Sequence, residues 1–153
     1  MVKFKTWLQL MVIVIFVAVA VSLVRSCQAD PTQIQLFDRL AMMRSDMQAI
    51  IDDGGRVVRY ENNEKTTFAR VYLLLSIDRQ AWTIDLQRAY ENTLLARGWV
   101  RVKGRANKLS LCKNGAFASV IAPTADRNGS IAMTFDAASI SKCQKLLSTG
   151  EVR

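Results

Sequence analysis

The feature that most constrains this chain is an apolar run close to its N-terminus. The 18 residues from Trp7 to Val24 include no charged side chain, and Lys3 and Lys5 precede them. A helix that spans a bilayer needs about 20 apolar residues, with a range of about 17 to 25, whereas the apolar part of a secretory signal has about 7 to 15. Residues 1–29 therefore predict a membrane anchor or signal segment. The lysines favour a cytoplasmic N-terminus, with the rest of the chain on the other side of the membrane.

Three interpretations of the stretch after this run remain open, and they differ in what happens to Cys27. In the first, the anchor is not cleaved and Cys27 lies beside the membrane. In the second, residues 24–27 (VRSC) resemble a bacterial lipoprotein box in which Cys27 is lipidated, although Arg25 stands where the box has a small uncharged residue. In the third, residues 27–29 form a cleavage site that releases the chain at Asp30. All three place the following domain outside the cytoplasm.

The other two cysteines, Cys112 and Cys143, lie in the part of the chain that we expect to fold. In an oxidising compartment such a pair predicts a disulfide. Closing a loop of about 30 residues would stabilise the fold by about 3 to 4 kcal/mol. The alternative is two buried free thiols in a cytosolic domain, since cysteine packs well as a small apolar side chain. The disulfide interpretation supports export independently of the N-terminal segment.

The residue types present exclude several chemistries. The chain contains no histidine, so imidazole zinc ligands and histidine-assisted nucleophiles cannot be formed. Its three cysteines have no C-x-x-C spacing, which leaves a metal ribbon or a thioredoxin-type motif without support. We therefore predict no catalytic, cofactor-binding or metal-binding residues and no enzyme activity. Acid and base chemistry by carboxylates, or the binding of a small ligand, remains the alternative of another class.

Residues 30–55 have the pattern of one amphipathic helix. Asp30 is a suitable N-cap, Pro31 suits the first turn, and Gly54 is a typical C-terminal stop. Apolar side chains recur every three or four residues between these ends, at Leu36, Leu40, Met43, Met47 and Ile50. Two interpretations remain open. The stripe packs on a sheet of the same chain, or its first four members form the contact face for a partner helix.

Residues 56–153 predict an exported domain of the α+β class. A polar turn at residues 62–65 and an Asn-Gly turn at residues 114–115 each separate two segments with strand patterning, so each turn predicts a β-hairpin. Helical periodicity is found at residues 84–97 and again at residues 139–147. This order of elements predicts a small antiparallel sheet with helices packed on it, after an N-terminal transmembrane helix.

A basic segment lies in the second half of the chain. Between Glu91 and Asp126 there are no acidic residues, whereas the net charge of the whole chain is +8. Five residues of this segment predict a patch for an anionic partner: Arg97, Trp99, Arg101, Lys103 and Arg105. The alternative is a solvated outer face of the sheet, because charged side chains are mostly exposed. No nucleic-acid recognition motif accompanies the segment, so we predict no nucleic-acid partner.

In outline the sequence resembles type IV pilins, which combine an apolar N-terminal helix, an amphipathic continuation, a β-meander and a late disulfide. It lacks the Gly-Phe leader-cleavage site and the early glutamate of mature pilins, and Pro31 interrupts the helix. More loosely, it resembles the bitopic assembly proteins of envelope secretion machines, which join one membrane span to a short helix and a small α+β domain. These resemblances imply a pilin-like or secretion-machine assembly subunit.

The residues themselves lead us to expect a non-enzymatic protein of the bacterial inner membrane. A single span would hold the domain in the periplasm, where it would bind another envelope protein. The role would be that of an accessory subunit of an envelope assembly or of an immunity-type inhibitor. We expect no cofactor and no metal.

Overall fold

The computed structural model describes four stretches of the chain, namely residues 13–17, 30–62, 69–104 and 108–150. The chain divides into two compact units, Met1–Asp30 and Pro31–Arg153, and the fold below is that of the second. Within the described residues, no helix is both long and apolar enough to span a membrane. Most of the N-terminal segment that was expected to form a transmembrane helix lies outside them, and so do Cys27 and Arg105.

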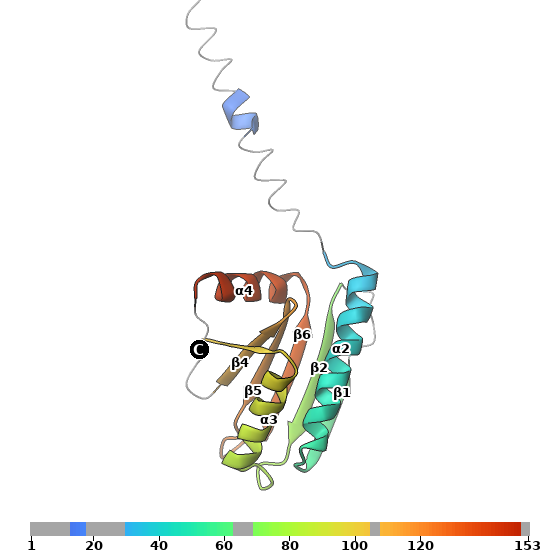
Figure 1. The fold of residues 1–153 in the computed structure, drawn as a ribbon, viewed down its shortest axis with the longest axis vertical. Coiled ribbons are helices and arrows are strands. Elements are labelled where there is room, and N and C mark those ends of the chain that lie inside the picture. The colour runs from blue at the N-terminus through green and yellow to red at the C-terminus, as the bar shows by residue number, and fades with distance from the viewer. Residues whose placement is uncertain (1–12, 18–29, 63–68, 105–107, 151–153) are drawn as a thin grey trace, which may run out of the picture. The chain divides into compact units, whose positions relative to one another are not determined.

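The described part of the second unit is an antiparallel sheet of six strands with three helices (Figure 1). In chain order the elements are α2 (Gln33–Asp52), β1 (Val57–Asn62), β2 (Val71–Ile77), α3 (Ile84–Ala96), β3 (Val100–Val102), β4 (Lys108–Lys113), β5 (Ala116–Ile121), β6 (Gly129–Phe135) and α4 (Ala137–Ser148). The strands lie in the order β1-β2-β6-β5-β4-β3, and every neighbouring pair is antiparallel. The predicted α+β class with an antiparallel sheet is confirmed.

The centre of the sheet is the pairing of β2 with β6, two strands that are far apart in the sequence. They pair along their whole length, from Val71 opposite Phe135 to Ile77 opposite Gly129. Because side chains alternate between the two faces of a strand, Leu73 and its partner Met133 point to the same face. Both are fully buried. This face of the sheet carries the main apolar core.

The helix α2 begins slightly later than the sequence predicts. Thr32, rather than Asp30, is its N-cap. The Thr32 hydroxyl accepts a hydrogen bond from the Gln35 N–H at 3.3 Å, and the Gln35 side chain accepts one from the Thr32 N–H at 3.0 Å. This reciprocal capping box satisfies two backbone donors at once, so Pro31 precedes the cap instead of lying in the first turn.

The apolar stripe of α2 packs on the sheet of its own chain. Leu36, Leu40, Met43 and Met47, which could have formed a partner face, are at most 5% exposed and belong to the main core. Covering the apolar face of β2 and β6 stabilises the fold by about 1.5 to 3 kcal/mol for each buried aliphatic side chain. The partner-helix interpretation is therefore wrong for this stripe, because the sheet of the same chain already occupies it.

The helix α3 packs beside α2 and contacts the turn at which α2 ends. The Tyr90 hydroxyl donates a hydrogen bond to the Gly54 carbonyl at 2.6 Å. Burial raises the pKa of Tyr90 to about 12, with a smaller contribution from Asp53, so the hydroxyl remains a donor. A Cβ at Gly55, where φ is +97°, would lie 2.5 Å from that hydroxyl oxygen. Glycine at this position therefore allows the close approach of α3.

The last helix, α4, lies across one end of the sheet (Figure 1) and is joined to β4 by a disulfide. Cys112 and Cys143 have Cα atoms 5.7 Å apart, which is within the usual range for a disulfide. Their sulfurs lie on the opposite face of the sheet from the main core, in a second apolar cluster with Val102 and Phe117. The bond therefore holds the C-terminal helix on the face that α2 and α3 leave uncovered.

Removing this disulfide should destabilise the domain and free α4. For Cys112→Ala or Cys143→Ala, the free energy of unfolding should fall by about 3 to 4 kcal/mol, because the unfolded chain regains the entropy of the closed loop. Denaturant unfolding would measure this loss, and limited proteolysis should cut first within α4.

The double variant Cys112→Ala/Cys143→Ala is the control. Since either single change already breaks the bond, the double variant should unfold with nearly the same free energy as the single variants. If the two losses add instead, each cysteine contributes through packing alone and the bond contributes nothing.

Candidate functional site

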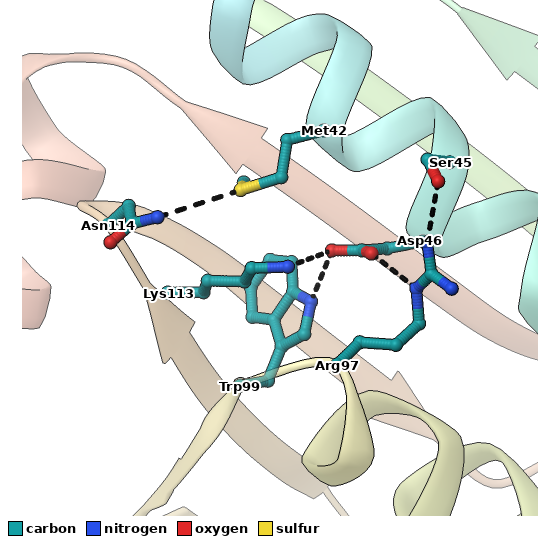
Figure 2. A network of polar contacts seen from close by, with 7 residues as sticks. All are labelled: Met42, Ser45, Asp46, Arg97, Trp99, Lys113 and Asn114. Carbon is teal, nitrogen blue, oxygen red and sulfur yellow. Dashed lines mark hydrogen bonds and ion pairs between the residues drawn. The ribbon is translucent and has the colours of Figure 1, made fainter.

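A buried carboxylate on α2 connects several segments of the chain (Figure 2). Asp46 is 2% exposed, and its two oxygens accept three hydrogen bonds from side chains. The Arg97 Nε–H donates to Oδ1, whereas the Trp99 indole N–H and the Lys113 ammonium each donate to Oδ2 at 2.8 Å. Arg97 also donates to the Ser45 hydroxyl. These five residues are called the Asp46 cluster below.

The ends of regular elements position the donors of the cluster. Arg97 is the C-cap of α3, Trp99 directly precedes β3, and Lys113 is the last residue of β4. Gly98, with φ at +85°, ends α3 and turns the chain, which is the usual role of glycine after a helix. As a result, the residues on either side of this glycine both reach the same carboxylate on α2.

Hydrogen bonds keep Asp46 ionised in spite of its burial. Burial alone raises the pKa of this carboxyl, but the hydrogen bonds from Lys113, Arg97 and Trp99 outweigh that effect and hold the pKa below its ordinary value. A carboxylate with a lowered pKa, whose oxygens are already occupied by three donors, is a poor general base. The arrangement suits a structural ion pair that joins α2 to the end of α3 and to β4.

The predicted anionic-partner patch is not one exposed surface. Trp99 is 2% exposed and packs in the main core, while Arg97 belongs to the Asp46 cluster and Arg101 forms an ion pair with Glu91 at 2.7 Å. Lys103 is exposed, and Arg105 lies outside the described residues. Trp99 faces the core, where its indole N–H donates to the buried Asp46 carboxylate. The prediction that these five residues jointly form a patch is therefore wrong.

A second carboxylate, which is only partly buried, also has a structural role. Asp136 caps α4 by accepting the Ser139 N–H at 2.7 Å, and it forms an ion pair with Arg70, also at 2.7 Å. Burial raises its pKa, but the hydrogen bonds from Ser139 and Arg70 outweigh burial and lower it. Lys142 borders the adjacent cavity of about 180 Å³, with its ammonium 3.5 Å from the centre of the Phe117 ring. This carboxylate is thus already paired within the domain.

Sequence reasoning did not identify Asp46, although a signal was present. Asp46 directly precedes Met47 and lies three residues after Met43, so it borders the apolar stripe of the helix. A charged residue at the edge of such a stripe is rarely buried unless it is paired. The pattern could not identify the partners of Asp46, because they lie 51 to 67 positions further along the chain.

The acidic and cysteine side chains of the described residues form no candidate metal site. Within the described residues, no group of three histidine, cysteine or acidic side chains could hold a metal ion. Comparison of the chain with protein-family models, with curated proteins and with solved structures finds no match.

Replacing the buried carboxylate tests the structural role of the Asp46 cluster. Asp46→Asn should lower the free energy of unfolding by about 3 kcal/mol, since it leaves Arg97 and Lys113 without their counter-charge in a partly buried position. Denaturant unfolding at neutral pH would measure the loss. The matched control is Asp38→Asn, because Asp38 lies on the exposed side of the same helix and its replacement should change stability by less than about 0.5 kcal/mol.

The pH dependence gives a second test with a defined sign. Because the folded-state pKa of Asp46 is below the ordinary value of 3.8, its contribution is complete above that value and is lost as the pH falls through the folded-state pKa. The difference in unfolding free energy between the wild type and Asp46→Asn should be constant from about pH 5 to pH 8 and should narrow below about pH 4. A difference that narrows between pH 5 and pH 8 instead would contradict this assignment.

Proposed function

We propose that this chain is a membrane-anchored, non-enzymatic domain that is exported to the bacterial periplasm and binds another envelope protein. The location is supported by the apolar run from Trp7 to Val24 and by the Cys112–Cys143 disulfide. Disulfides persist in oxidising compartments and are rare in the cytosol. The two features are independent, because one depends on hydropathy and the other on the approach of two side chains in the fold.

The proposed binding of another protein is supported by the exposed outer edge of β1. This strand ends the sheet, and among the described residues it pairs with β2 only. Val58 is 53% exposed and Tyr60 is 43% exposed. An exposed edge with apolar side chains can accept an extended segment of another chain, whose main chain would continue the ladder of hydrogen bonds.

The geometry supports the competing proposal, a carboxylate-dependent enzyme, less well than it supports a binding domain. Asp46 and Asp136 are bound by side chains or backbone groups of the same domain, and the pKa of each is lowered. A general acid at neutral pH needs a raised pKa instead. Both carboxylates therefore fit the proposal of a binding domain better than that of a catalyst.

The proposed location predicts how the protein fractionates. The full chain should remain with membranes after a carbonate wash, and protease added to the periplasmic side should digest the domain. Mass spectrometry of the N-terminus would identify its fate, since lipidation at Cys27 entails the loss of residues 1–26. Recovery of the intact chain from the cytosol would overturn this proposal.

The proposed interaction predicts a contact at β1. A photo-crosslinking amino acid at Val58 of the full chain should form a covalent adduct with one envelope protein, because the partner strand would lie beside this edge. Val58→Lys should reduce copurification of that protein without lowering the unfolding temperature, since Val58 is largely exposed and charged residues on edge strands oppose pairing.

Ile84 is the matched control position. It is 71% exposed and lies on α3 rather than on β1. A crosslinker at Ile84 and the variant Ile84→Lys should leave adduct formation and copurification unaffected. Equal crosslinking from both positions would show that the contact is nonspecific.

A further inference from the structure

A cavity of about 250 Å³ opens at the corner between α2, α4 and the turn that joins β4 to β5. Phe135 at the end of β6 and Gly115 in the turn line this cavity. Arg39 of α2 and Leu147 of α4 also line it. None of its lining residues lies on β1, so this cavity is separate from the exposed sheet edge.

The unequal lengths of the helices explain why this corner is open. α2 has 20 residues and α3 has 13. Tyr90 of α3 donates to Gly54, just after α2 ends, and Arg97, the C-cap of α3, donates to Asp46 in the C-terminal half of α2. Both contacts therefore lie toward the C-terminal end of α2, away from Gln35 and Arg39. The space that α3 would fill is bordered instead by α4, which lies across the end of the sheet (Figure 1).

Arg39 brings a guanidinium with one unsatisfied donor to this cavity. Its Nε is buried and has no hydrogen-bond partner among the described residues. Its guanidinium carbon lies 5.9 Å from the centre of the Phe135 ring, so this ring helps to hold the guanidinium by a cation–π contact. A buried donor without an acceptor is destabilising, and more so when the group is charged. The described part of the domain therefore supplies no acceptor for the Arg39 Nε–H.

The other groups that line the cavity are electrically neutral. Arg39 is the one charged side chain among the described lining residues, and no carboxylate accompanies it. Gln35, Asn114 and Gln144 contribute amide groups, which can donate hydrogen bonds to an anionic oxygen. A guanidinium presents Nε–H and Nη–H as a planar fork that matches the two oxygens of a carboxylate.

We propose that this cavity binds a carboxylate group of a protein partner, with Arg39 as its principal ligand. The volume is below the roughly 300 to 1,000 Å³ that is usual for small-molecule sites, so it suits one side chain or a chain end. Leu147, which is 43% exposed, provides apolar surface beside the charge. The identification of the partner as a protein rests on the proposed function, whereas the preference for a carboxylate rests on the cavity alone.

Three short peptides test this proposal on the full chain in detergent micelles. Acetyl-Ala-Ala-Glu-amide carries a carboxylate on its side chain only, acetyl-Ala-Ala-Ala carries one at its C-terminus only, and acetyl-Ala-Ala-Gln-amide carries none. Titration would be followed by the NMR resonances of the Arg39 Nε–H and of the Gly115 backbone N–H. At least one carboxylate peptide should shift both resonances in a saturable manner, and the neutral peptide should not.

Substitution of the arginine provides the second measurement. Arg39→Met keeps an unbranched apolar side chain over Phe135 and should weaken carboxylate binding by about tenfold or more, as expected for the loss of a hydrogen bond to a charged group. Without peptide it should unfold at the same temperature as the wild type or a higher one, because an unsatisfied donor has been removed. Arg39→Lys should bind with intermediate affinity, since it retains the charge but not the fork. The matched control, Arg88→Met, removes an exposed arginine from α3 and should leave binding unchanged.

The outcomes are distinct. Binding of only the glutamate peptide identifies an acidic side chain as the partner group, and binding of only the free-acid peptide identifies a chain terminus. The proposal is overturned if no carboxylate peptide shifts the resonances, if the neutral peptide shifts them equally, or if Arg39→Met binds as the wild type does. Because the crosslinking test at Val58 concerns another surface, it can fail while carboxylate binding is observed, and the reverse also holds.

Discussion

The pairing of β2 with β6 is the interaction on which the rest of the domain depends. It joins β1 and β2 to the β6-β5-β4-β3 meander, and among the described strands no other pair connects these two parts of the sheet. The apolar face that α2 covers exists only after these strands are adjacent, because Leu73 and Met133 come from opposite sides of this junction. Bringing two strands together that are far apart in the sequence costs loop-closure entropy before any apolar surface is buried. This cost is expected to slow folding.

The Asp46 cluster adds directional contacts to this nondirectional core. Hydrophobic packing fixes which face of α2 is buried, but it tolerates small shifts of a helix along the sheet. Three hydrogen bonds from Arg97, Trp99 and Lys113 converge on one carboxylate, and only one position of the helix satisfies all of them. A buried ion pair of this kind contributes less to net stability than to a unique arrangement, a role that is known from other folds and is a hypothesis for this one.

Local sequence patterns were sufficient to predict most helices and strands. They could not predict which segments these helices and strands pack against. The spacing of Leu36, Leu40, Met43 and Met47 identified the helix and its apolar face, but the same spacing suits a partner helix, and only the sheet decides between the two. Asn114-Gly115 identified the β4–β5 hairpin because its turn chemistry is local. The basic segment was misinterpreted because charge was judged along the sequence, whereas Asp46 and Glu91, which pair with its arginines, lie outside it. Arg39 gave no signal, since an unsatisfied donor is a property of the assembled cavity.

The disulfide also has a consequence for the order of events during biosynthesis. The chain is made from its N-terminus, so Cys112 is synthesised 31 residues before Cys143. Until the last helix emerges, the other cysteine that the chain offers to Cys112 is Cys27. A bond between these two would tie the meander to the segment before α2, and thiol–disulfide exchange would have to resolve it. The native pairing can therefore form only after the last helix has been synthesised.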